Sequence, residues 1–178
     1  MFHSLGMIRL LCDFGSGTQE LVVKSPKPLN DGEWHTIEIF FETQTVRLMV
    51  DHCIDAVIYD SEPLKMDRTR CENTTDYHFF NEGLNINAPL QVGGVSHQSI
   101  DKYYNWTERH TRSGFTGCIR NLMQNNFIYD FGSVFNSANS LPGCAPGILI
   151  FILQFNISDR SAHQLQFNRC VIIFLICV

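Results

Sequence analysis

The chain has 178 residues, with 13 Lys and Arg against 18 Asp and Glu, so its net charge is −5. A length near ~150 residues is typical of one domain, or of one domain followed by a tail. The acidic balance argues against a nucleic-acid partner, because phosphate binding requires a basic surface. Apolar residues make up 44% and charged residues 17%, which excludes a disordered chain and a coiled coil, and 14 Phe residues favour a β-rich protein.

Short alternating runs separated by turn residues indicate four strands in the first fifty residues. The first strand covers residues 7–14, and the second, residues 20–24, follows the turn Gly15-Ser16-Gly17. A loop rich in Pro, Asn, Asp and Gly then leads to two further alternating runs, residues 34–42 and 46–50. The short turn between these two runs predicts a β-hairpin.

The second half of the chain has longer connections but keeps the same short strands. Residues 60–87 are polar and irregular, which predicts a long functional or decorated loop. A strand interrupted by two glycines is expected at residues 90–95, and residues 115–123 and 127–131 predict a second hairpin. No stretch before Ser133 has a helical period, so the fold class predicted is all-β, an antiparallel β-sandwich.

The composition changes after the sandwich. Residues 148–157 and 171–178 are dense in Ile, Phe and Leu, with no turn residues and no alternation. We therefore place the domain at residues 6–144 and interpret residues 147–178 as a hydrophobic tail foreign to it, of splice-variant, read-through or truncated origin. The alternative is a genuine additional pair of core strands.

The cysteines and glycosylation sequons indicate an oxidising, extracellular setting. Seven cysteines are dispersed along the chain without any C-x-x-C pair, so zinc ribbons and thioredoxin-like sites are not expected. N-x-S/T sequons occur at Asn73, Asn105 and Asn156. The start of the chain has no secretory signal, and its apolar runs are shorter than the ~20 residues of a transmembrane helix, so we expect a fragment of a longer protein.

Several motifs, in order along the chain, resemble those of laminin G-like domains. The motif Leu29-Asn30-Asp31-Gly32-Glu33-Trp34-His35 is similar to the loop and Trp-His strand of that family. Further similarities occur at residues 13–17, 90–94, 115–122 and 143–144. The segment between Cys53 and Cys71 is most similar to the laminin G-like domains of invertebrate neural-type cadherins.

The resemblance implies a jelly-roll sandwich that is linked by disulfides. Cys118 and Cys144 match the disulfide of the family, and Cys53 and Cys71 are expected to close the loop after the first hairpin. Cys12 is interpreted as a buried free thiol. The family begins with several strands before residue 7, and we expect these N-terminal strands to be missing here.

The resemblance also implies a calcium site, which we expect to be incomplete. Asn85 occupies the position of one side-chain ligand, and the carbonyls of Phe14 and Gly83 would contribute two more oxygens, the ligand type that Ca²⁺ prefers. The family's Asp ligand lies upstream of Gly6 and has no counterpart in this sequence. We therefore expect Ca²⁺ binding to be weak or absent, with Asn85 as a simple turn residue as the alternative.

Catalysis is not expected from these residues. A glycosidase would need two carboxylates ~5–10 Å apart, and the nearest candidates, Asp31 with Glu33 and Asp51 with Asp55, lack the same-face spacing within one strand. His35 has no nucleophile near it in sequence, so we interpret it as a packed or hydrogen-bonded structural residue.

A small basic and aromatic patch is the candidate partner-binding surface. Arg109, Arg112 and Trp106 lie close together in sequence, and arginine and aromatic residues are frequent in binding hot spots. The alternative is a solvated loop that a glycan on Asn105 would shield.

Together these observations predict a non-catalytic module of a calcium-dependent, cadherin-like cell–cell adhesion protein that serves in adhesion or spacing. We expect EGF-like neighbours and a cell-surface location, as part of a single-pass membrane protein. The expected partners are surface or matrix proteins, and homophilic contact is a further candidate for the full-length protein. The alternative is an extracellular-matrix or receptor laminin G domain that binds glycans or protein ligands.

Overall fold

A computed structural model describes most of the sandwich and parts of the segment that follows it. The residues described are 7–13, 17–42, 44–58, 63–77, 90–94, 115–133, 136–138, 152–155 and 169–177. Of the last three ranges the backbone pairing is described.

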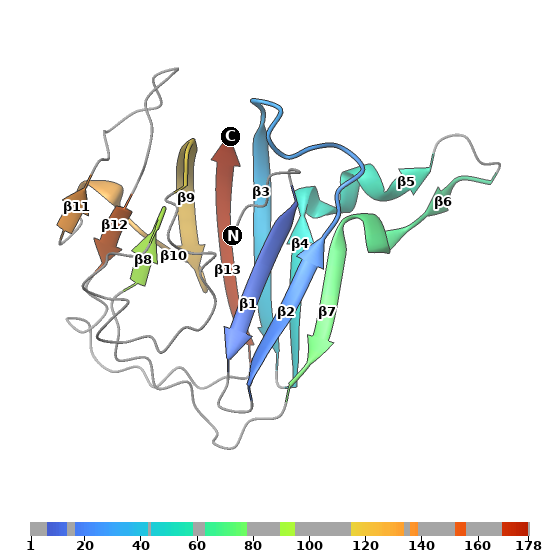
Figure 1. The fold of residues 1–178 in the computed structure, drawn as a ribbon, viewed down its shortest axis with the longest axis horizontal. Coiled ribbons are helices and arrows are strands. Elements are labelled where there is room, and N and C mark those ends of the chain that lie inside the picture. The colour runs from blue at the N-terminus through green and yellow to red at the C-terminus, as the bar shows by residue number, and fades with distance from the viewer. Residues whose placement is uncertain are drawn as a thin grey trace.

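The described residues form strands and short 3₁₀ helices (Figure 1). The strands are β1 (Ile8–Asp13), β2 (Thr18–Val23), β3 (Trp34–Glu42), β4 (Thr45–Val50), β5 (Val57–Ile58), β6 (Lys65–Met66), β7 (Glu72–Asp76), β8 (Leu90–Val92), β9 (Cys118–Gln124), β10 (Phe127–Ile128), β11 (Asn136–Ala138), β12 (Ile152–Phe155) and β13 (Arg169–Cys177). The 3₁₀ helices are η1 (Asp51–Ala56), η2 (Arg68–Arg70) and η4 (Phe131–Ser133).

The strands pair antiparallel and form four sheets within the described part of the chain. The largest has the order β10-β9-β13-β3-β4-β7, and the smaller ones are β1-β2, β11-β12-β8 and β5-β6. The β1–β2 hairpin lies across the face of β3 and β4, whereas β5 and β6 extend away from the sandwich (Figure 1). The expected all-β, antiparallel fold class is confirmed.

The core lies between the β1–β2 hairpin and the large sheet. Alternation brings every second residue of β3 and β4 to the inner face, including Ile37, Ile39, Val46 and Leu48. These side chains pack with the buried residues of the hairpin, such as Leu21, and the core cluster also contains Cys12. Each fully buried aliphatic side chain contributes about 1.5–3 kcal/mol, so the packing of the hairpin against the sheet contributes substantially to stability.

Both hairpins predicted from sequence are present. Strands β3 and β4 pair from Ile37 with Val50 to Phe41 with Val46. Strands β9 and β10 are joined by Asn125 and Asn126, both of which have positive φ, as a two-residue type I′ turn requires. The second hairpin is shorter than predicted, because β10 ends two residues after the turn.

The prediction of an irregular loop over residues 60–87 is wrong for its middle part. Residues 72–76 form β7, the edge strand of the large sheet, which pairs with β4 along its whole length. Its sequence, Glu-Asn-Thr-Thr-Asp, is polar because most of these residues are solvent-exposed. The side chains of Asn73 and Thr75 bind β2, at Val22 O (3.0 Å) and at Gln19 Oε1 (3.3 Å), and so close one side of the sandwich.

The segment after Gly147 contributes strands to two sheets. Strand β12 pairs with β8 and β11, and β13 lies between β3 and β9 in the large sheet (Figure 1). The described parts of this segment, β12 and β13, thus both pair with strands from earlier in the chain.

Candidate functional site

The sandwich has a strained turn at the end of β4. Three successive non-glycine residues, Asp51, His52 and Cys53, have φ values of 49°, 51° and 61°. Left-handed backbone costs L-residues about 1 kcal/mol or more each, and such strain persists only where the surroundings fix it. Residues held in this way are frequent at functional sites, so the contacts that hold each of the three define a candidate site.

The carboxylate of Asp51 is bound by two residues at the start of β3. Its Oδ1 accepts a hydrogen bond from the backbone N–H of Thr36 at 2.7 Å, and its Oδ2 lies 2.7 Å from Nδ1 of His35. On the other side of the imidazole, Nε2 lies 3.0 Å from Oδ1 of Asp31. The same Asp31 oxygen accepts the backbone N–H of Glu33 at 2.9 Å, an Asx turn that orders the loop before β3.

His35 is therefore held between two carboxylates, and both ring nitrogens donate when the ring is protonated. Burial by itself lowers the pKa of His35, but the hydrogen bonds and charges of Asp51 and Asp31 outweigh it, so the net effect is a raised pKa. The pKa of Asp31 is lowered, first by the Glu33 N–H and then by His35. The expectation that His35 is hydrogen-bonded is confirmed.

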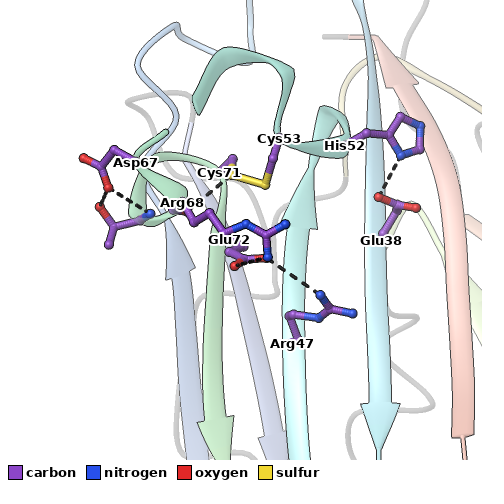
Figure 2. Close-up of a disulfide and its surroundings, with 9 residues drawn as sticks. Glu38, Arg47, His52, Cys53, Asp67, Arg68, Cys71 and Glu72 are labelled. Carbon is purple, nitrogen blue, oxygen red and sulfur yellow. Dashed lines mark hydrogen bonds and ion pairs between the residues drawn. A yellow bond between two sulfur atoms is a disulfide. The ribbon is translucent and has the colours of Figure 1, made fainter. Parts of the chain in front are cut away.

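The other two strained residues are also tethered through their side chains (Figure 2). His52 Nδ1 lies 3.0 Å from Oε2 of Glu38, a buried carboxylate on β3. Cys53 forms a disulfide with Cys71, the pairing that we expected for this loop. Each residue of the strained turn thus has its own tether, and two of the three tethers reach β3.

The disulfide closes a projecting loop, residues 53–71, which we call the arm. Its base contains a small buried cluster of Cys53, Ala56 and Cys71, separate from the main core. Two backbone hydrogen bonds support this base, from Val50 N to Cys71 O (2.9 Å) and from Asp67 N to Ala56 O (2.8 Å).

The arm also carries exposed apolar side chains and a capped turn. Ile54 and Leu64 are each 64% exposed, and Met66 is 57% exposed. Asp67 caps η2 by accepting hydrogen bonds from the N–H and the hydroxyl of Thr69. Ion pairs of Glu72 with Arg68 and Arg47, at 3.4 and 3.8 Å, connect the end of the arm with the outer face of the sheet (Figure 2).

Three of the four carboxylates considered as candidate glycosidase residues bind other side chains. Asp31 and Asp51, one member of each candidate glycosidase pair, both bind His35, and Asp55 binds Lys27 at 3.0 Å. The described residues contain no group of three or more His, Cys, Asp or Glu side chains that could hold a metal ion. Within the same residues, no helix is long and apolar enough to cross a membrane.

The remaining predicted site residues are only partly covered by the structure. Asn73 is exposed on β7, and Cys118 on β9 is disulfide-bonded. Cys12 is a buried free thiol, as expected, and burial raises its pKa to about 11. The other predicted site residues lie outside the described residues. They are the proposed calcium ligands (Phe14, Gly83 and Asn85), the expected disulfide partner of Cys118 (Cys144), the second glycosylation site (Asn105) and the basic patch (Trp106, Arg109 and Arg112).

The network around the strained turn is not predicted from the sequence. His35 and the two aspartates are interpreted separately there, because Asp51 lies sixteen residues after His35 and only strand pairing brings them together. The spacing of Asp31 and His35 around a tight turn is the one local signal. The left-handed turn contains neither Gly nor Asn, and Asp51 and His52, which tolerate positive φ better than most residues, are only a weak signal for it.

Comparisons with known proteins agree with the strand arrangement. The family model described as "Laminin G domain" matches residues 4–127. Over 143 residues, or 78% of the chain, the sequence is 47% identical to Neural-cadherin and 43% identical to Putative neural-cadherin 2, both of Drosophila melanogaster. It is 33% identical over 141 residues to Cadherin-related hmr-1 of Caenorhabditis elegans.

These alignments cover a small part of each relative: 5%, 8% and 4% of its length, respectively. No solved structure has significant similarity to the chain.

Proposed function

This chain belongs to the laminin G domain family, and we propose that it is a non-catalytic extracellular module of a cadherin-like, calcium-dependent cell–cell adhesion protein. The observation that supports this proposal is the 47% and 43% identity to two Drosophila neural cadherins over 143 residues, with a third cadherin-related protein at 33%. As part of a single-pass membrane protein, the module lies at the cell surface, beside EGF-like modules.

The module acts by spacing and ordering its neighbours rather than by chemistry. Two features support this role. The arm at one end of the sandwich is closed by a disulfide, and the carboxylates of Asp31 and Asp51 are hydrogen-bonded to His35. Surface or matrix proteins are the partners, and homophilic contact takes place through the rest of the full-length protein.

Calcium contributes to this module weakly or not at all. The proposed ligands, Asn85 and the carbonyls of Phe14 and Gly83, include no carboxylate, and a neutral oxygen set gives low affinity. Calorimetric titration with CaCl₂ tests this point, with a millimolar dissociation constant or no heat expected. Saturation at micromolar Ca²⁺ would contradict it.

A domain replacement in Drosophila Neural-cadherin tests the adhesion role. The homologous segment of that protein is replaced by residues 1–144 of this chain, and aggregation of transfected, otherwise non-adherent cells is measured with and without Ca²⁺. We expect surface delivery and Ca²⁺-dependent aggregation close to those of the parent, and a loss of one or both when the segment is deleted.

Two controls separate adhesion from mere secretion. A chimaera with an unrelated β-sandwich of similar size tests whether spacing alone is sufficient, and surface biotinylation corrects for delivery. Failure of the replacement at normal surface level would contradict the proposal. Saturable binding of the isolated chain to heparan sulfate or another glycan would instead favour the alternative, a matrix or receptor laminin G domain.

A further inference from the structure

The last strand of the chain fills a gap in the large sheet. β13 pairs with β3 at nine positions, from Arg169 with Glu42 to Cys177 with Trp34. On its other edge it pairs with β9, from Ile172 with Gln124 to Cys177 with Cys118, with an irregularity between Ile173 and Leu175. Both edges of β13 are therefore hydrogen-bonded within one sheet.

This strand is connected to its neighbours only over a long stretch of chain. β3 ends at Glu42 and β9 at Gln124, whereas β13 begins at Arg169. The preceding strand, β12, belongs to a different sheet, and residues 156–168 join the two. In addition, β13 lies beyond the residues that match the family model, which end at residue 127. Both pairing partners of β13, β3 and β9, thus lie far from it in sequence.

The sequence of β13 favours pairing with the unpaired edge of a β-sheet. Residues 171–176 read Val-Ile-Ile-Phe-Leu-Ile, without charge, Gly or Pro. Such segments have high β-propensity and pair readily with unpaired strands. Without β13, β3 and β9 would each present a row of unpaired backbone N–H and C=O groups, which is a template for another strand.

We propose that the gap between β3 and β9 is a strand-binding site that accepts β13 of a second copy of this chain as well as its own. The backbone pairs formed in the two cases are identical, so the bound strand differs only in its connection. Covalent attachment favours the chain's own strand as a raised local concentration would, in the millimolar range for short linkers in general, and dense display on a surface can approach such concentrations. Reciprocal insertion gives a strand-swapped dimer.

A chain whose own strand is broken tests the site. Ile172 lies in the middle of β13, opposite both Ile39 and Gln124, and Ile172→Pro removes a backbone N–H at this position. The probe is a labelled peptide with the sequence of residues 169–177, Ser in place of both Cys and flanking lysines. The control peptide has Pro at the position of Ile172.

We expect saturable one-to-one binding of the peptide to the Ile172→Pro chain by fluorescence anisotropy. The control peptide and the unmodified chain should bind at least tenfold more weakly, and hydrogen exchange should slow in β3 and β9. If the variant does not fold, it is refolded with either peptide, and only the intact peptide should restore β-structure. Equal binding to the unmodified chain, or neither binding nor rescue, would refute the proposal.

A complementary pair of full chains identifies the occupant. The Ile39→Pro chain has a broken site but an intact β13, whereas the Ile172→Pro chain has a broken β13 but an intact site. Mixed during refolding, the two should form a heterodimer, measured by light scattering as twice the 20.4 kDa mass of one chain. Two monomers, even with peptide binding, would exclude a second copy as the occupant.

Discussion

Removal of the disulfide between Cys53 and Cys71 should destabilise the protein by about 3 kcal/mol. The cross-link closes a loop with a sequence separation of 18, and the loss of loop-closure entropy in the unfolded chain gives about 3 kcal/mol at 25 °C for that length. For a chain of 150–250 residues this corresponds to a decrease of about 6–12 °C in Tm. The change to test is the double substitution Cys53→Ser, Cys71→Ser.

Urea unfolding of the variant and the unmodified protein, both without reductant, gives the comparison. A reductant is unsuitable because Cys118 is also disulfide-bonded. Arg68→Ala is the matched control in the same loop. It removes an exposed ion pair with Glu72, and a loss below about 0.5 kcal/mol is expected. If the free energy of unfolding of the double variant falls by less than about 1 kcal/mol, the argument that the disulfide stabilises by restricting the unfolded chain is refuted.

Three further substitutions test the contacts around the sandwich. His35→Gln should lower the free energy of unfolding by about 2 kcal/mol at pH 6. Because the folded-state pKa of His35 is raised, this difference should be fully present below about pH 6.5 and should shrink as the pH rises through the folded-state pKa. Urea unfolding at each pH measures it. Tyr77→Phe should cost about 1–3 kcal/mol, because the buried Tyr77 hydroxyl donates to the carbonyl of Glu42, and thermal unfolding with an unchanged far-UV spectrum would measure it. Secreted protein should carry N-glycans on Asn73 and Asn105, so Asn73→Gln should remove one glycosidase-sensitive mass step; an unchanged mass would show that this sequon is not used.

The parts of the fold that the sequence predicts are those governed by local alternation and turn residues. The alternating residues of 34–42 and 46–50 face the core as predicted, because strand alternation is independent of the partner. Gly32 has a φ of 85° and is the middle residue of the Asx turn from Asp31 to Glu33. These features depend on neighbours a few residues away, so sequence reasoning can find them.

The features that sequence reasoning missed depend on residues that are distant in the chain. β7 forms because β4 offers it a backbone edge, although its own residues are polar and mostly exposed. Likewise, the position of β13 depends on the gap between β3 and β9, and its apolar sequence is compatible with many partners. Hydrophobic periodicity reports which face is buried, and it contains no information about which strands pair.

The three tethers of the strained turn fix the orientation of the arm, although the arm has a buried cluster of its own, separate from the main core. The tethers of Asp51 and His52 end on β3, so the orientation of the turn follows a central strand of the large sheet. The buried cluster of the arm, however, shares no residue with the main core. Local opening of such a unit requires less free energy than global unfolding. The disulfide joins both ends of the arm at this cluster and therefore opposes local opening as well as global unfolding. The exposed Ile54, Leu64 and Met66 are thus presented from a base that stays attached to β3.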